Sequence, residues 1–207
     1  MTGLASRRFL IVVAAAYVAG IAAYPKLPGP APGVARPLIA FLLPTTAALT
    51  YLLARRVWLR DAVRDGDEAF EPTYDAIFFS VVLFIVALHL LVIGTLTGVV
   101  PAQRAWLNRS TMVLFGLLML RIGNLLPRTR PNLVFGIRTP RTLTNREFWM
   151  RLHRVAGYVT VVLGSVVVLS GTFLSHQRIG NVLGPTALAA AAVLAFSYKK
   201  YSPKPVI

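Results

Sequence analysis

The chain contains no cysteine, which excludes disulfide bonds, thiol nucleophiles and cysteine-ligated metals. Acidic side chains are also scarce, since 7 Asp and Glu stand against 22 Lys and Arg in 207 residues. Charged residues make up only 14% of the chain, against roughly 25% in an ordinary soluble domain, and hydrophobic residues make up 56%. Despite the formal net charge of +15, this balance predicts an integral membrane protein and not a nucleic-acid-binding protein.

The common motifs for nucleotide binding, zinc proteolysis and serine nucleophiles are also missing from the sequence. We therefore predict no enzymatic activity, no cofactor and no metal. His89 lies inside an apolar run and is expected to be a hydrogen-bonded core residue. A haem held by two histidines needs a second one at matching depth, and neither His153 nor His176 fits.

Six apolar runs are long enough to be read as bilayer-spanning helices, which need about 20 residues each. They cover residues 9–24, 38–54, 76–100, 111–126, 155–175 and 179–198. Pro44 lies inside the second run, and the carbonyl that it leaves without a donor needs Thr45, Thr46 or a packed helix as its partner. The predicted fold is an all-α, polytopic membrane protein with six transmembrane helices in a single domain, residues 1–207.

Basic residues are unevenly distributed between the two sides that this plan defines. With six spans both termini lie on one side, and most Lys and Arg residues fall on that side. The other side holds only Lys26, Arg36, Arg104, Arg109 and Arg178. Because cytoplasmic connections accumulate Lys and Arg, we predict that both termini and the connection 127–154 are cytoplasmic.

The connection 127–154 contains a predicted helix. Thr144 followed by Glu147 fits a capping box, so the helix should begin near Asn145. Its apolar side is formed by Phe148, Trp149, Leu152 and Val155, and its polar side by Arg146, Arg151 and Arg154. This pattern predicts a short amphipathic helix at the membrane interface before span five, with Trp149 at the depth of the lipid headgroups.

Small residues suggest how the last two spans pack. Residues 187–195 read ALAAAAVLA, and Gly164 and Gly171 offer a similar surface on span five. Small side chains let membrane helices approach closely, so we expect a tight hairpin of spans five and six. The same small face also suits a partner subunit, and the sequence leaves both options open. Arg121, near the cytoplasmic end of span four, either extends to the headgroups or pairs with a functional group.

The order of residues from span four to span five is more specific than its charge. Its members are Gly123, Asn124, Pro127, Asn132, the GIRTP motif from Gly136 to Pro140, Thr142, Leu143, Trp149, His153, Arg154 and Gly157. This order, within residues 121–158, closely resembles the cytoplasmic signature of the SdpI family. These are polytopic bacterial membrane proteins named for immunity to a secreted sporulation-delaying toxin. Members usually carry Trp after the GIRTP motif, where this chain has Arg141.

The resemblance implies a multi-pass protein of the bacterial inner membrane that gives immunity to, or senses, a membrane-active peptide toxin and tethers a cytoplasmic repressor. The implied site residues are Asn124, Pro127, Asn132, Gly136, Arg138, Thr139, Pro140, Trp149, His153 and Arg154. One alternative is a non-catalytic accessory subunit of a larger membrane complex. Another, supported only by the density of arginine, is an enzyme or transporter that acts on an anionic lipid or phosphate.

Within this signature, we expect the GIRTP turn to be held by its own polar residues. We expect the turn to be held against spans four and five by Asn132, Arg138 and Thr139. Asn124 and His153 are the expected hydrogen-bond partners, because buried polar groups close to lipid must be paired. The surrounding basic residues are expected to bind anionic lipid headgroups.

Overall fold

The computed structural model describes residues 3–28, 35–60 and 71–203, and this part of the chain is helical. Its α-helices are α1 (Gly3–Ala23), α2 (Arg36–Arg60), α3 (Glu71–Leu96), α4 (Arg104–Leu125), α5 (Pro140–Thr144), α6 (Arg146–Phe173) and α7 (His176–Tyr201). Six of them, all but α5, are long and apolar enough to cross a membrane. The predicted all-α polytopic fold is therefore confirmed.

The fourth and fifth spans begin earlier than their apolar runs. The span that contains α4 covers Arg104–Arg128, and α6 covers Arg146–Phe173, because polar first turns continue directly into each apolar run. The amphipathic segment expected at the interface is thus the first part of α6 and not a separate helix, which corrects that prediction. The short helix that precedes span five is α5.

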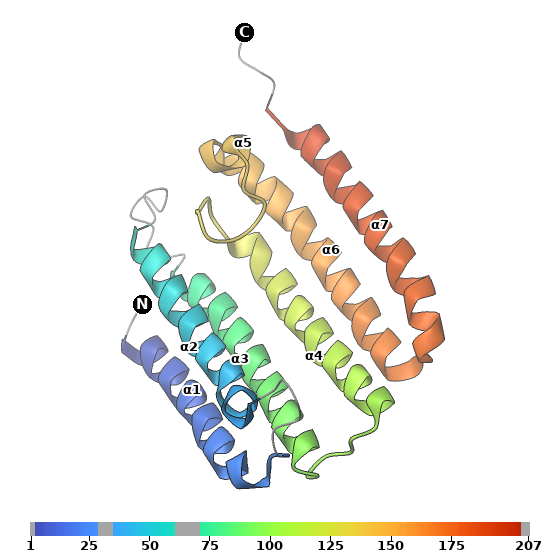
Figure 1. The fold of residues 1–207 in the computed structure, drawn as a ribbon. Coiled ribbons are helices and arrows are strands. Elements are labelled where there is room, and N and C mark those ends of the chain that lie inside the picture. Colours follow the sequence, from blue (N-terminus) through green and yellow to red (C-terminus); the bar gives the residue numbers. More distant parts are fainter. Residues whose placement is uncertain (1–2, 29–34, 61–70, 204–207) are drawn as a thin grey trace.

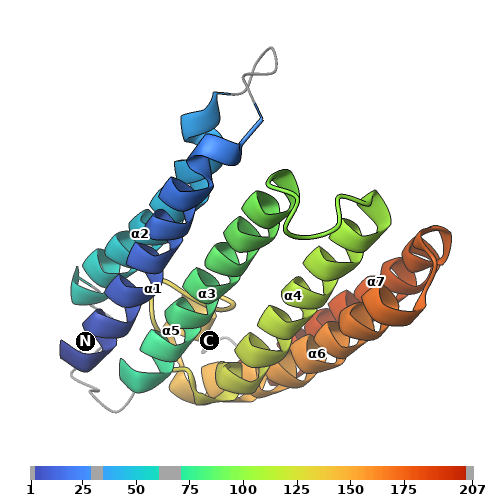
Figure 2. The same cartoon turned by 90° about the horizontal axis from the view of Figure 1, so that it is seen from below.

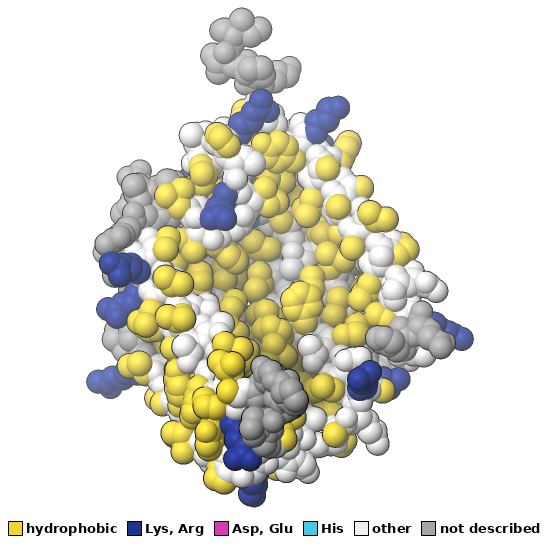
Figure 3. Space-filling model, in the orientation of Figure 1, with side chains coloured by type: hydrophobic (Ala, Val, Ile, Leu, Met, Phe, Trp, Pro, Cys, Tyr) yellow, Lys and Arg dark blue, Asp and Glu magenta, His cyan; other side chains and the backbone are white. Residues whose placement is uncertain are grey.

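The start of α1, the end of α7 and the loop around α5 lie at the same end of the molecule (Figure 1). We call this the loop end. In the space-filling view, Lys and Arg side chains gather near the two ends, and apolar side chains cover most of the surface between them (Figure 3). This distribution is typical of a protein whose middle faces lipid.

Helices α1, α2 and α3 pack together in the N-terminal half. Near the loop end the ring of Phe9 stacks on Tyr51 with 4.2 Å between their centroids. Deeper in the bundle, Nε2–H of the fully buried His89 donates to the carbonyl of Ala16 at 3.1 Å. His89 is therefore a hydrogen-bonded core residue, as predicted.

The proline in α2 is accommodated by a packed helix. Pro44 cannot donate to the carbonyl of Ala40, four residues earlier. Gly20 of α1 lies against that carbonyl so closely that a Cβ on Gly20 would be 2.5 Å from its oxygen. Among the described residues, the neighbouring helix lies against this carbonyl as a packing contact and not as a hydrogen-bond donor. The hydroxyl of Thr45 instead hydrogen-bonds to Tyr17 at 2.8 Å, and Thr46 donates to Leu42.

Helices α4 and α6 are antiparallel and meet through glycines spaced seven residues apart. A Cβ on Gly123 would lie 2.9 Å from the carbonyl oxygen of Gly157, and one on Gly116 would lie 2.9 Å from that of Gly164. Only glycine allows backbones to approach this closely. Gly171 continues the row against Met112 of α4. The prediction that Gly164 and Gly171 face the last span is therefore wrong.

Helices α3, α4, α6 and α7 follow one another in a row, each packing on the next (Figure 2). The hairpin of α6 and α7 is tight, as expected, with only Leu174 and Ser175 between the helices. However, the small residues expected at this contact face outward, since every alanine in residues 187–195 except Ala190 is exposed. Gly180 and Gly184 have no other residue within 4 Å of the position that a Cβ would take.

Candidate functional site

The loop that joins α4 to α5 is anchored on α6 by a buried tryptophan. Nε1–H of Trp149 donates to the hydroxyl oxygen of Thr129 at 3.2 Å. That hydroxyl donates in turn to the carbonyl of Leu126 at 2.7 Å. Trp149 has no exposed surface, so its ring does not contact the lipid headgroups as an exposed interfacial residue would. Its indole serves instead as an internal support for the loop.

Asn132 shapes the first half of the loop. Its Oδ1 accepts the backbone N–H groups of Val134 at 3.0 Å and Phe135 at 2.8 Å, and its Nδ2 donates to the carbonyl of Arg130 at 2.7 Å. An asparagine that bonds backbone groups two and three residues ahead closes a tight turn. Nη1 of Arg138 donates to the carbonyl of Leu133 across the same turn.

His153 receives the GIRTP motif. The backbone N–H of Ile137 donates to Nε2 of His153 at 3.0 Å, and Nδ1–H of His153 donates to the carbonyl of Trp149 at 2.9 Å. The imidazole also stacks on the indole of Trp149 at 3.9 Å. Because Nε2 accepts while Nδ1 donates, this geometry requires the neutral ring.

Gly136 is required where the chain passes over these two rings. Its φ of 106° lies in the region that side chains rarely tolerate. A Cβ at this position would also collide with Nε2 of His153 and lie 3.2 Å from the indole of Trp149. This Cβ would also block the hydrogen bond from the N–H of Ile137 to Nε2 of His153.

A capping box closes the second half of the loop. The N–H of Thr139 donates to Oγ1 of Thr142 at 2.8 Å, and the N–H of Thr142 donates to Oγ1 of Thr139 at 3.2 Å. Pro140 occupies the first turn of α5, where its missing N–H costs nothing. The hydroxyl of Tyr198, on α7, donates to Oγ1 of Thr139 at 3.1 Å. Arg141, where family members usually carry Trp, donates to Ser202 beyond α7 at 3.1 Å.

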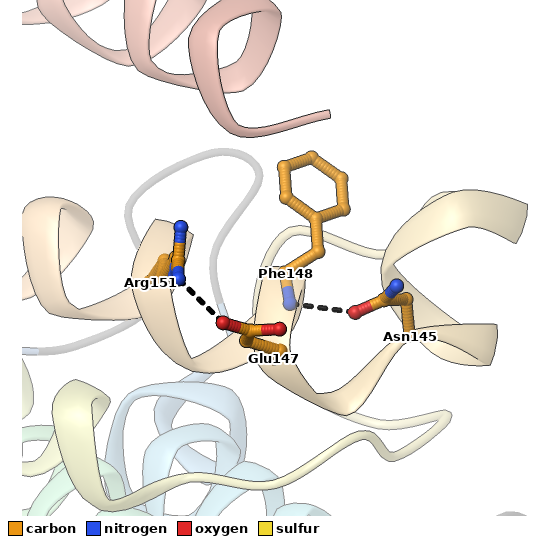
Figure 4. A network of polar contacts seen from close by, with 4 residues as sticks. All are labelled: Asn145, Glu147, Phe148 and Arg151. Atoms are coloured by element: carbon orange, nitrogen blue, oxygen red, sulfur yellow. Dashed lines mark hydrogen bonds and ion pairs between the residues drawn. The ribbon is translucent and has the colours of Figure 1, made fainter. Parts of the chain in front are cut away.

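The predicted capping box at Thr144 and Glu147 does not form. Asn145 caps α6 by accepting from the N–H of Phe148 at 2.8 Å, while Glu147 pairs with Arg151 (Figure 4). The predicted start of this helix near Asn145 is correct, because Asn145 is itself a favourable capping residue. The ring of Phe148 packs edge-on against Tyr198 at 5.3 Å.

The loop also contacts the N-terminal half, which the sequence did not indicate. Val134 packs against Tyr74 of α3, and Phe78 of the same helix packs against Tyr74 as well. The hydroxyl of the buried Tyr74 donates to the carbonyl of Ala54 on α2 at 2.7 Å. No motif in the sequence marks Tyr74, because its partner lies on a segment about sixty residues away.

The structure brings together eight of the ten predicted site residues. Pro127, Asn132, Gly136, Thr139, Pro140, Trp149 and His153 build the folded loop or its support, and Arg138 crosses it from an exposed position. Asn124 and Arg154 do not join them. Asn124 is exposed and makes no side-chain hydrogen bond with another described residue, so its expected role as a partner of the loop is not supported.

These features define a polytopic α-helical membrane protein in which a hydrogen-bonded loop caps one end of an antiparallel helix pair. Residues 128–198 match the family model described as the SdpI/YfhL protein family. The resemblance to the SdpI family that was predicted from the sequence is thereby confirmed over the loop, α5, α6 and most of α7. No curated protein and no solved structure matches the chain.

The loop end carries a strongly basic surface. Arg128, Arg138, Arg141, Arg151 and Arg154 are all exposed, and Glu147 is paired with Arg151. The polar groups of Asn132, Thr139 and His153 are occupied in holding the loop, whereas Arg128 and Arg154 make no ion pair or side-chain hydrogen bond with another described residue. This arrangement favours the binding of anionic groups.

Proposed function

We propose that this protein is an SdpI-like membrane protein that gives immunity to, or senses, a membrane-active peptide toxin. The observation that carries the proposal is the family match over residues 128–198, within which the buried side chains of Asn132, Trp149 and His153 hold the loop through hydrogen bonds. The proposed location is the bacterial inner membrane, with the loop end in the cytoplasm. A non-catalytic role is consistent with the use of His153 in holding the backbone.

The hydrogen-bonded loop suggests how such a protein would transmit a signal. It contacts α3 through Val134, α6 through Ile137 and α7 through Thr139. A toxin that shifts any of these helices in the membrane would therefore alter the basic surface of the loop end. A cytoplasmic repressor with an acidic surface, or anionic lipid headgroups, are the partners that this surface would hold.

A survival assay tests the proposal. Susceptible bacteria that express the wild-type chain should tolerate a membrane-active peptide at concentrations that kill bacteria with an empty vector. His153→Ala should abolish this protection, whereas Met150→Ala, an exposed position nearby on α6, should preserve it. Both variants must be present in the membrane at equal amounts. Equal survival with vector and wild type, across a panel of such peptides, would contradict the immunity role.

A second candidate is a non-catalytic accessory subunit of a larger membrane complex. The observation that favours it is the outward-facing surface of α7, where Leu188, Val193 and Phe196 are exposed beside small residues. Purification in a mild detergent distinguishes the two functions. A stoichiometric membrane partner that remains bound would favour the subunit role, and a toxin-dependent soluble partner would favour sensing.

A further inference from the structure

Asn124, a signature residue that the loop does not use, lies on the same side of the α4–α6 pair as Tyr158. Asn124 follows Gly123, and Tyr158 follows Gly157, by one residue each; these glycines are in contact. One residue is a rotation of about 100° around a helix. Asn124 and Tyr158 are therefore each rotated by about 100° from the surface where the two helices touch. Because the helices are antiparallel, these two rotations place both residues on the same side of the helix pair.

Two arginines share this side with them. Arg121 lies three residues before Asn124, and Arg154 lies four residues before Tyr158, which are the spacings of neighbours on a helix surface. At a rise of about 1.5 Å per residue, Arg121 and Arg154 lie on opposite sides of the Gly123–Gly157 contact and roughly 8 Å apart along the helix axes, within the reach of two long side chains. The four side chains therefore form one patch, which we call the lateral patch.

The lateral patch faces away from the loop. Tyr158 lies nine residues after Trp149, half a turn around α6, and is 65% exposed, whereas Trp149 is buried beneath the loop. Arg121, Asn124 and Arg154 are also exposed. None of these three makes an ion pair or a side-chain hydrogen bond with another described residue. Glu147, on the same side of α6, is paired with Arg151.

The depth of the patch limits what can occupy it. Arg121 lies inside the candidate span Arg104–Arg128, seven residues before its end at the loop end. A guanidinium at this depth is stabilised by extending to the headgroups or by pairing with an anion, and a lipid phosphate provides both. The patch offers two guanidinium groups, an amide N–H₂ and a phenolic O–H, all of which donate hydrogen bonds. A phosphate diester, with its acceptor oxygens, matches this set.

We propose that Arg121, Asn124, Arg154 and Tyr158 form a binding site for the phosphate group of an anionic phospholipid, with the acyl chains lying along the outer surface of α4 and α6. This site is separate from the loop and does not depend on the proposed role in immunity. The exposed apolar side chains of Leu117, Val162 and Leu169 continue the same surface of α4 and α6 toward the other end.

Native mass spectrometry of the detergent-purified protein, titrated with phosphatidylglycerol, tests the site. We expect Arg121→Gln and Arg154→Gln each to weaken binding of the first lipid by about tenfold, as for the loss of one charge-assisted hydrogen bond. Arg121→Lys should weaken it as well, because lysine lacks the planar fork of donors. The control is Arg55→Gln, an exposed arginine on α2, which should leave binding within twofold.

Two results would overturn the proposal. If Arg55→Gln weakens binding as much as Arg121→Gln, the lipid is held by diffuse charge and no site exists. If inorganic phosphate at the same concentration displaces phosphatidylglycerol, the patch takes free phosphate and not a lipid. All substituted side chains are exposed, so the variants should unfold at the wild-type temperature. If an arginine variant loses both lipid binding and thermal stability, Tyr158→Phe is tested in its place. This change removes one hydroxyl and should still weaken lipid binding.

Discussion

The side chain of His153 accepts a hydrogen bond at 3.0 Å from the backbone N–H of Ile137, 16 residues earlier in the chain. This bond joins the GIRTP motif to α6 and explains why a histidine occupies a fully buried position. Its other nitrogen is held by the carbonyl of Trp149. The residue therefore orders the loop and is not available as a ligand or a base in this state.

Removal of this histidine should loosen the loop. His153→Ala leaves the N–H of Ile137 without a partner and removes the stacking on Trp149, which should lower the free energy of unfolding by about 3 kcal/mol. His153→Gln should recover part of this loss, because its amide oxygen can accept in place of Nε2. Thermal unfolding in detergent and proteolysis within residues 130–139 measure the effect. Met150→Ala is the control, and an equal loss there would contradict this role.

The glycine row should tolerate no side chain. Gly157→Ala places a Cβ 2.7 Å from the carbonyl oxygen of Gly123, and overpacking of this kind should cost about 2 kcal/mol. The matched control is Gly180→Ala on α7, which has open space and should be neutral or stabilise the helix by up to about 1 kcal/mol. Melting temperatures of the two variants decide the point. Similar shifts in both would show that α4 and α6 are not in close contact.

Single introduced cysteines should report the orientation of the chain, since it contains none of its own. Thr144→Cys lies at the loop end and should be protected from a membrane-impermeant thiol reagent added to intact cells. Ala102→Cys, exposed at the opposite end, should be labelled. Permeabilised cells provide the control in which both positions react. The reverse pattern would place the loop outside the cytoplasm.

Arginines at the loop end should differ in their tolerance of lysine. Arg138 donates to the carbonyl of Leu133 across the turn, so Arg138→Lys should increase the proteolysis of the loop. Arg128→Lys keeps the charge of an exposed side chain and should leave the rate unchanged, because attraction to an anionic leaflet depends on charge alone. Rates of cleavage in mild detergent measure both. If both variants behave as wild type, Arg138 contributes only charge.

Local patterns in the sequence were sufficient for several features of the fold and the site. The six spans follow from apolar length, and the start of α6 near Asn145 was predicted correctly, although Asn145 and not Thr144 is the capping residue. His89 could be placed in the core because an isolated histidine in an apolar run needs only one carbonyl as its partner. The signature residues of the GIRTP loop could be recognised from their order alone.

The choice between alternative partners required the tertiary structure. The sequence contains two glycines on span five and a small-residue face on span six, but their packing depends on how the helices rotate, and α4 offers matching glycines in register. Likewise, Trp149 has the amphipathic setting of an interfacial residue, and only the loop folded over it makes it buried. The sequence by itself determined which segments are helical and apolar, because those properties depend on near neighbours. The tertiary structure decided which faces meet, because contacts such as those of Val134 with Tyr74 join residues distant in the chain.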